Sequence, residues 1–488
     1  MKNGKLIQNY VYNTLYQILI LLAPLITTPY ISRVLGATNI GIYQYSQSIA
    51  SYFVLLGAVG TSLYGQREIA YLSDKPEERS TAFWEIEVFR LITTLFCSVL
   101  YYCLFCTHES HSQIFRILTL EVIATAFDIS WLYMGMENFR LTVVRNTIIK
   151  VTGIICVFLF VKSPEDVDVY TFAVTAPLFL GNISLWFSLK KTIVKTHLTM
   201  RKLFRGIKKR LWAIVSLFLP QVAMDVYLLL DKTMIGLLGR AFDQVGYYSE
   251  AQKIVKIALA VVTSLGTVML PTMSALFAKG NYEEIKKKIV IAFRFIYMLS
   301  FAMMFGIIAV APKFVPIFFG DGYDPVVYLM ILISPILVII ATSNVIGRQF
   351  LLPTNQQKGF TISIIAGAGV NLILNFLFIP LWDAVGASVA TVIAELAVTG
   401  VQCWFVRKQI PLKQCFMSGS RYALFGAVMF LVCSGVGRIM PDGRLWALIV
   451  LVGTGVAVYC TELIGTKDPM IKMALGIIRN KGKNGNKT

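Results

Sequence analysis

About fourteen apolar stretches, each roughly 17–25 residues long, follow one another along this chain with short polar segments between them. Each is long enough to cross a hydrocarbon core of about 30 Å as an α-helix, because a helix rises 1.5 Å per residue. Together with their loops they occupy almost all of the 488 residues. We therefore predict an all-α polytopic membrane protein without a soluble domain. The predicted spans lie at 10–31, 42–65, 84–105, 114–134, 146–162, 168–188, 212–237, 245–270, 289–310, 326–348, 360–380, 384–406, 418–438 and 443–464.

The charges support this class and indicate an orientation. Charged residues make up 15% of the chain, whereas a soluble domain carries about 25%. The net charge of +19 would favour nucleic-acid binding in a soluble protein, but most of the 45 lysine and arginine residues fall into alternate loops. That asymmetry is the positive-inside pattern of membrane proteins. It predicts that both termini are cytoplasmic, and it argues against a nucleic-acid partner.

The longest interruption between spans is a basic segment at 190–211, in which Leu203, Phe204 and Ile207 recur at helical spacing. We expect an amphipathic helix on the inner leaflet, with its lysines at anionic headgroups. The predicted parts of the chain are an N-terminal lobe of six helices at 1–189, this basic cytoplasmic linker at 190–211, a C-terminal lobe of six helices at 212–406, two additional helices at 407–464, and a basic cytoplasmic tail at 465–488 that is disordered at its end.

A weak internal repeat supports two lobes. A Leu-Gly pair at Gly36 is followed by Gly41-Ile-Tyr, and a second Leu-Gly pair at Gly239 is followed by Gly246-Tyr-Tyr. Both copies lie between an odd-numbered predicted span and the next one. A repeat of six spans predicts two halves of the same orientation, related by a pseudo-two-fold axis along the membrane normal.

Carboxylates inside the predicted spans form a first group of candidate functional residues. A charge at the bilayer centre costs about 2.5–3.5 kcal/mol on insertion scales, so each one needs a partner or a wet cavity. Arg90 and Asp128 lie at equal depth in neighbouring predicted spans, which predicts an ion pair; a coupling-ion or proton site at Asp128 is the alternative. Asp225 and Glu395 are further candidates for ion coupling, although Glu395 can instead form a structural hydrogen bond with Asn371.

Lysines inside the spans form a second group. Lys232 lies seven residues after Asp225, on the same helix face, and Lys253 and Lys256 begin the eighth predicted span. A lysine near the end of a span can reach back to the interface. Several cations at similar depth instead favour one wet, positive cavity, which suits an anionic phosphate group. A cluster of two cysteines and two histidines at 103–111 has a histidine spacing too short for a zinc finger and no loop between its pairs, and no nucleotide-binding or hydrolase motif is found, so no metal site is predicted.

Four short stretches carry a family resemblance. Residues 29–43, which read Pro-Tyr-Ile-Ser-Arg-Val-Leu-Gly before a Gly-x-Tyr, resemble the first-loop signature of polysaccharide flippases. Residues 231–236, 245–254 and 347–353 are similar to later signatures of the same proteins. These are the Wzx-like, lipid-linked-oligosaccharide branch of the multidrug/oligosaccharidyl-lipid/polysaccharide exporter superfamily.

The resemblance implies two six-helix lobes around a central cavity. It also implies alternating access that carries a polyprenyl-pyrophosphate-linked oligosaccharide from the cytoplasmic to the outer leaflet of a bacterial inner membrane, for surface polysaccharide biosynthesis. Cations that hold the pyrophosphate in such proteins match Arg33, Lys232, Lys253 and Lys256 here. The resemblance further implies a monomeric transport unit that is not an enzyme and needs no cofactor. Its partners would be the lipid-linked glycan, membrane lipids and a coupling cation, H⁺ or Na⁺.

Three other functions compete with this interpretation. A cation-coupled small-molecule or drug antiporter of the same superfamily would need a cavity dominated by carboxylates, and this chain offers Asp128, Asp225 and Glu395. A membrane enzyme such as a glycan polymerase or ligase would need long outer loops to handle its substrate, and the predicted ones are short. A purely structural membrane scaffold is the remaining alternative.

Overall fold

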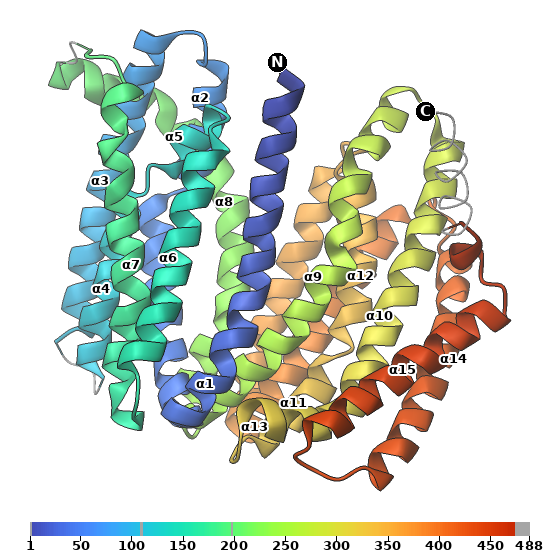
Figure 1. Cartoon of the computed structure of the whole chain (residues 1–488). Coiled ribbons are helices and arrows are strands. Elements are labelled where there is room, and N and C mark those ends of the chain that lie inside the picture. Colours follow the sequence, from blue (N-terminus) through green and yellow to red (C-terminus); the bar gives the residue numbers. More distant parts are fainter. Residues whose placement is uncertain (1, 108–110, 197–198, 474–488) are drawn as a thin grey trace. The chain divides into compact units, whose positions relative to one another are not determined.

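The computed structural model describes residues 2–107, 111–196 and 199–473, and over these ranges the chain is almost entirely helical (Figure 1). The predicted all-α polytopic class is confirmed. The helices are α1 (Lys2–Ala58), α2 (Thr61–Tyr71), α3 (Pro76–Phe105), α4 (Ser112–Phe127), α5 (Ser130–Gly135), α6 (Phe139–Phe160), η1 (Pro164–Asp166), α7 (Val167–Phe187), η2 (Leu189–Lys191), α8 (Met200–Leu238), α9 (Phe242–Ala278), α10 (Tyr282–Phe319), α11 (Asp324–Ile333), α12 (Ile336–Ile346), the π-helix η3 (Gly347–Leu351), α13 (Gln357–Val406), α14 (Leu412–Ile439) and α15 (Leu445–Gly465).

Eleven helical stretches of the described chain are long and apolar enough to cross a membrane, which makes this a multi-pass membrane protein. Two of them, of 58 and 50 residues, contain a sharp backbone break, at Gly36 (φ 74°) in α1 and at Asp383 (φ 48°) in α13. Both breaks fall between spans that we predicted as separate helices. The total of fourteen spans therefore stays a prediction.

The break at Gly36 has a clear local cause. Its positive φ is the left-handed region that favours glycine, and the next residues turn the chain into the second segment of α1. The side-chain amide of Asn39 then donates to the carbonyl oxygen of Leu35 at 3.1 Å and to that of Pro164 at 2.8 Å. The first copy of the repeat thus marks a break inside one long helix. The second copy lies at the end of α8 and the start of α9.

By packing, the chain divides into a first unit, Met1–Gly246, and a second unit, Tyr247–Thr488. Helix α8 packs on α1, α2 and α3, so it belongs to the first unit, although we predicted it as the first helix of the C-terminal lobe at 212–406. The transport lobes at 1–189 and 212–406 stay a prediction. Helices α14 and α15 occupy the predicted additional part at 407–464.

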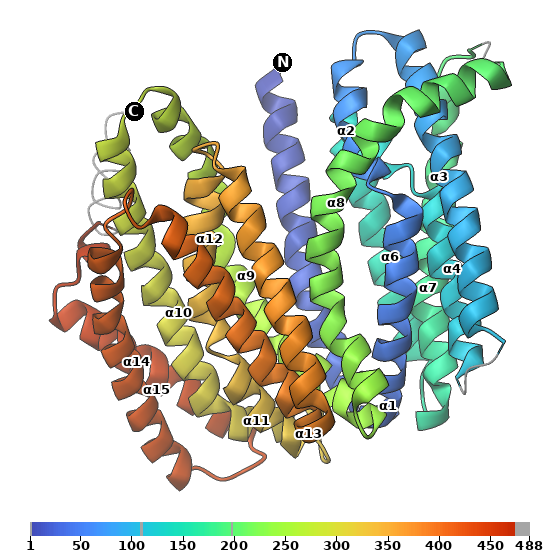
Figure 2. The same cartoon turned by 180° about the vertical axis from the view of Figure 1, so that it is seen from behind.

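The predicted linker at 190–211 is not an independent helix. Residues 193–196 are neither helix nor strand, and α8 begins at Met200 and continues without interruption to Leu238. Figure 2 shows that the first turns of α8 lie across the ends of α2 and α3, whereas the rest of the helix runs alongside its neighbours.

An aromatic cluster forms part of the core of the first unit. Phe83 of α3 stacks on Trp131 of α5 with ring centroids 5.5 Å apart, and both are fully buried. Gly65 of α2 allows this packing, because a Cβ there would lie 2.4 Å from the Trp131 ring. The hydroxyl of Tyr133 donates to the Leu185 carbonyl oxygen at 2.9 Å and ties α5 to α7.

In the second unit, α10 packs on α12, α14 and α15. The start of the predicted tail at 465–488 docks back onto α14: the buried carboxylate of Asp468 accepts hydrogen bonds from the Tyr422 hydroxyl at 3.1 Å and pairs with Arg421 at 3.6 Å. The rest of the predicted tail, from residue 474, lies outside the described residues.

Candidate functional site

Lys232 lies on α8 where this helix packs against the second segment of α1. Its Nζ donates to Gln44 Oε1 at 2.7 Å. The next residue, Thr233, shares a hydrogen bond of 2.8 Å with Ser48. One turn further, Gly236 brings the two helices together, because a Cβ there would lie 2.1 Å from an aromatic ring of α1. The predicted cation Lys232 is therefore held at a polar section of a tight helix interface.

Arg33 has a different setting in the same unit. It is exposed, and it lies three residues before the break at Gly36. Its Nη1 donates to the Pro29 carbonyl oxygen at 2.7 Å. A guanidinium is the side chain best suited to bidentate recognition of a phosphate group.

The two remaining predicted cations lie in the first half of α9, in the part of this helix that belongs to the second unit. Lys253 forms an ion pair with Glu250, one turn earlier, at 2.6 Å. Glu250 is 2% exposed and Lys253 is 28% exposed. Lys256, which is exposed, donates to Gln252 Oε1 at 2.9 Å. Each ammonium group is thus held by a side chain about one turn before it in the same helix, Lys253 by Glu250 and Lys256 by Gln252.

Glu250 is an ion partner within the candidate site that the sequence analysis did not assign to it. Glu250 lies three residues before Lys253 in the sequence, but we predicted only the cations of this segment as site residues. Because Glu250 neutralises Lys253 in part, the pair presents less net charge to an anion than an isolated lysine would. It also positions the lysine, because the carboxylate is almost fully buried. The convergence of all four predicted cations on one substrate stays a prediction.

A buried charge network surrounds Asp128 in the first unit. Asp128 follows the last residue of α4, where the chain breaks before α5. The predicted ion pair with Arg90 is present at 4.0 Å. Arg145 of α6 is closer, at 3.4 Å, and its Nη1 also donates to Asn182 of α7 at 2.6 Å. Asp128 therefore joins the arginines of two helices.

Arg145 was missed because we predicted a span at 146–162 and assigned the preceding residue to a cytoplasmic loop. Helix α6 begins earlier, at Phe139, so Arg145 lies well inside it and is 9% exposed. Two guanidinium groups on one carboxylate favour a structural role for Asp128. A metal cation would be repelled there by the same charges.

Two further carboxylates lie in the same helices: Glu87, which we did not predict as a site, and the half-buried Glu121, seven residues before Asp128. Glu87 is fully buried, three residues before Arg90 on α3. Neither of its carboxyl oxygens has a hydrogen-bond partner within the described parts of the chain. Glu121 of α4 interacts with Gln47 of α1. Their spacing from Arg90 and Asp128 along each helix was the signal that could have identified them.

The other two predicted coupling carboxylates, Asp225 and Glu395, lie on α8 and α13. Asp225 is half-buried on α8 and interacts with Gln221, one turn before it. Glu395 is half-buried on α13. Asn371, its predicted neighbour, accepts a hydrogen bond of 3.1 Å from Asn375, one turn later in the same helix.

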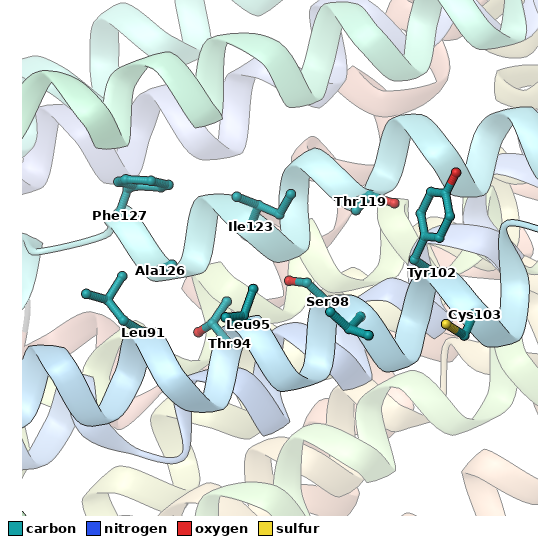
Figure 3. A pocket seen from close by; sticks show the side chains of 11 residues that line it. Leu91, Thr94, Leu95, Ser98, Tyr102, Cys103, Thr119, Ile123, Ala126 and Phe127 are labelled. Atoms are coloured by element: carbon teal, nitrogen blue, oxygen red, sulfur yellow. The ribbon is translucent and has the colours of Figure 1, made fainter.

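An apolar groove lies between α3 and α4 and is separate from all these charges. Its volume is about 500 Å³, and side chains such as Leu95, Tyr102 and Ile123 line it (Figure 3). Leu95 and Tyr102 are exposed. Since both helices are candidate membrane spans, this groove is a feature of the apolar surface and not a binding site for a charged group.

Comparison with known proteins gives a family. The family described as polysaccharide biosynthesis protein matches residues 6–277. A protein of Escherichia coli (strain K12) named "Putative O-antigen transporter" is 24% identical over 414 residues, which cover 82% of this chain and 96% of the relative. The lipid II flippase MurJ of Bacillus subtilis (strain 168) is 25% identical over 248 residues, which cover 48% of this chain and 45% of the relative.

Solved structures show the same fold. The lipid II flippase MurJ in an inward closed conformation superposes with a TM-score of 0.72 at 16% identity, over 95% of this chain and 100% of that one. An inward-facing multidrug resistance transporter of the MATE family, within the MOP superfamily, superposes with a TM-score of 0.60 at 12% identity, over 79% of this chain and 94% of that one. The fold expected from the resemblance is confirmed.

Proposed function

The chain belongs to the polysaccharide biosynthesis protein family, and from this membership we propose that it flips a lipid-linked oligosaccharide across the membrane for surface polysaccharide biosynthesis. Its substrate would be a polyprenyl-pyrophosphate-linked glycan that moves from the cytoplasmic to the outer leaflet by alternating access. The O-antigen transporter and flippase names of its relatives support this class of substrate.

The observation that carries the proposal is the set of cations within apolar helices. Lys232 and Lys253 are half-buried in α8 and α9, where each positive charge costs free energy of insertion. Lys253 pairs with Glu250, and Lys232 and Lys256 donate to the neutral side chains of Gln44 and Gln252. A set with net positive charge suits a pyrophosphate, which would bind through Arg33, Lys232, Lys253 and Lys256 by charge-assisted hydrogen bonds.

The direction of transport follows from the positive-inside pattern. We propose a bacterial inner-membrane protein with both termini in the cytoplasm, so that the glycan leaves the side on which the basic loops lie. A coupling cation, H⁺ or Na⁺, would drive the cycle. Of the three carboxylates considered for it, Asp225 and Glu395 remain candidates, whereas Asp128 is held by two arginines. The transport unit would be a monomer.

A transport assay in cells tests the proposal. The gene is deleted in its own host, and surface glycan and lipid-linked intermediates are measured with wild-type and variant copies. Loss of one charge-assisted hydrogen bond costs about 1.5–3 kcal/mol, a roughly 10- to 150-fold weaker interaction. We therefore expect the Arg33→Ala, Lys253→Ala double variant to abolish surface glycan and to accumulate the intermediate at the inner leaflet.

A control removes the same charge elsewhere. Lys286 and Lys287 lie near the start of α10, where Lys286 pairs with the exposed Glu283. A Lys286→Ala, Lys287→Ala variant should export normally. Full export by the Arg33, Lys253 double variant would refute the cation site. Normal surface glycan in the deletion strain, together with a changed drug susceptibility, would favour the antiporter instead.

A further inference from the structure

The first turns of α8 form a surface that the transport proposal does not use. We call residues 200–212 the basic arm. Arg201, Lys202, Arg205, Lys208 and Lys209 are all exposed. So are four of the arm's apolar residues: Met200 at 68%, Phe204 at 52%, Leu211 at 39% and Trp212 at 81%. An exposed surface that is strongly basic and strongly apolar at once needs a partner that meets both properties.

The arm's side chains separate into three stripes along the helix. Successive residues are about 100° apart around a helix axis. Leu203, which is 7% exposed, lies on the stripe that packs against the protein. Met200, Phe204 and Leu211 fall within about 40° of one another on the next stripe. The five basic residues cover the adjoining arc of about 120°, with Trp212 among them.

A single arginine fixes the arm against the first unit. Arg210 donates from Nε to Glu85 of α3 at 2.7 Å, and from Nη1 to Tyr64 of α2 at 3.1 Å and to Glu68 of α2. Gly206 lies directly against the carboxylate of Glu85, since a Cβ there would come within 1.8 Å of Oε1. The stripe that packs against the protein is therefore held at two successive turns, at Gly206 and at Arg210. This fixes the directions in which the apolar and the basic stripes point.

The segment before the arm is fastened as well. The backbone N–H of Val194 donates to Ser80 Oγ at 2.9 Å, and Arg79 Nη2 donates to the Thr192 carbonyl oxygen at 3.1 Å. Both bonds tie residues preceding the arm to the start of α3. The arm thus begins from a fixed point at the end of the helices and leads directly into the apolar part of α8.

We propose that the basic arm is a binding surface for anionic phospholipids. The apolar stripe would enter the boundary between headgroups and acyl chains, and the basic stripe would hold the lipid phosphates. An apolar stripe next to a basic one is the pattern of helices that lie in a membrane interface. Trp212, at the junction with the apolar part of α8, is the residue type that favours this depth. The inference does not depend on what the protein transports.

The apolar stripe beside the charges favours a lipid surface over a nucleic acid. A nucleic acid would use the lysines and arginines but would leave Met200, Phe204 and Leu211 in water. An anionic bilayer meets both stripes at once. Each lysine or arginine near such a surface contributes roughly a fivefold gain in binding, and the contribution falls within a Debye length, about 8 Å at physiological salt.

The experiment uses the purified full-length protein with phosphatidylglycerol or phosphatidylcholine added in detergent, and counts retained lipids by native mass spectrometry. The test variant carries Lys202→Gln, Arg205→Gln, Lys208→Gln and Lys209→Gln. We expect the wild type to retain phosphatidylglycerol over phosphatidylcholine, and the test variant to bind phosphatidylglycerol at least about tenfold more weakly. A Phe204→Ser, Leu211→Ser variant should weaken the binding of phosphatidylglycerol as well, because it removes the apolar stripe.

The matched control removes four charges from another basic segment by Lys279→Gln, Lys286→Gln, Lys287→Gln and Lys288→Gln, and it should keep the preference for phosphatidylglycerol. Thermal unfolding should be unchanged in the test variant, because none of the Arg210 contacts is altered. A Lys202→Arg, Lys208→Arg, Lys209→Arg variant keeps the charge of the arm and should retain the binding of phosphatidylglycerol. Equal lipid retention by the wild type and the test variant would overturn the proposal. So would an equal loss in the control, or tighter arm-dependent binding to an oligonucleotide than to phosphatidylglycerol at physiological salt.

Discussion

Gly41 of α1 faces Gly246 of α9 so closely that a Cβ on Gly41 would lie 3.0 Å from the Gly246 nitrogen and 1.7 Å from the Phe242 carbonyl oxygen. The contact is reciprocal, because a Cβ on Gly246 would lie 2.1 Å from the Ala37 carbonyl oxygen. Ala37 precedes Gly41 by four residues, as Phe242 precedes Gly246. The two copies of the sequence repeat thus meet each other at equivalent positions, and the pseudo-two-fold relation of the lobes stays a prediction.

A Gly41→Ala variant tests this crossing. The new methyl group would collide with backbone, which cannot rotate away as a side chain can, so the helices must separate. We expect a loss of about 1–3 kcal/mol of stability, typical of overpacking, measured as a lower thermal unfolding midpoint. Gly400→Ala on α13 is the control, since a Cβ there meets nothing within 4 Å. It should be neutral or slightly stabilising. Equal midpoints for the two variants would contradict the close approach.

Variants of the pair Glu250 and Lys253 should affect stability and glycan export differently. Lys253→Ala leaves the buried Glu250 without its ion partner and should cost roughly 1–3 kcal/mol. This is less than the 3–5 kcal/mol of a fully buried pair, because Lys253 is 28% exposed. The Glu250→Ala, Lys253→Ala double variant should recover most of this stability but not glycan export. If the double variant exports normally, Lys253 serves only to balance Glu250.

The network at Asp128 predicts unequal effects. Asp128→Ala removes the acceptor of two buried guanidinium groups and should cost more than either arginine variant, roughly 1–3 kcal/mol because Asp128 itself is 30% exposed. Arg145 is 3.4 Å from Asp128 and Arg90 is 4.0 Å away. Double-mutant cycles on thermal stability should therefore give a larger coupling energy for the Arg145 pair than for the Arg90 pair. Simple additivity in both cycles would mean that Asp128 holds neither arginine.

Arg210 predicts a change in protease sensitivity. Arg210→Lys can keep one of the contacts to Glu85, Glu68 and Tyr64, but an ammonium cannot reproduce the geometry of the guanidinium. Arg210→Ala should free the basic arm and speed tryptic cleavage between 201 and 209, and Arg210→Lys should give an intermediate rate. Cleavage of all three proteins at one rate would show that these bonds do not fasten the arm.

Much of the fold was predictable because hydropathy reports each helix directly. The predicted spans at 84–105 and 146–162 end within two residues of the C-terminal ends of α3 and α6, at Phe105 and Phe160. Helix continuity was not predictable, because hydropathy separates apolar stretches whether the chain between them turns or stays helical. The residues around Gly36 read as a loop, yet a single residue of positive φ sufficed to redirect α1.

Some charged residues inside the spans could be identified from the sequence, but their partners could not all be predicted. Depth along neighbouring spans identified Arg90 and Asp128, because charges at one level inside a bilayer must compensate each other. It did not identify Arg145, whose depth depends on a helix start that is uncertain by several residues. Three-dimensional packing alone determines that Asn182 directs Arg145 toward Asp128.

The attachment of α8 to α1, α2 and α3 has a consequence for synthesis. The ribosome completes α1 to α7 before it reaches the basic arm, and at that moment Glu68 and Glu85 still lack Arg210. The partners of Ser48 and Gln44 on α8 are also still missing. A nascent chain that stops in the linker at 190–211 therefore holds two acidic side chains and an open face on α1. The contacts that α8 makes with α1, α2 and α3 can form only after α8 has been synthesised, so the first unit is completed by the last helix that lies wholly within it.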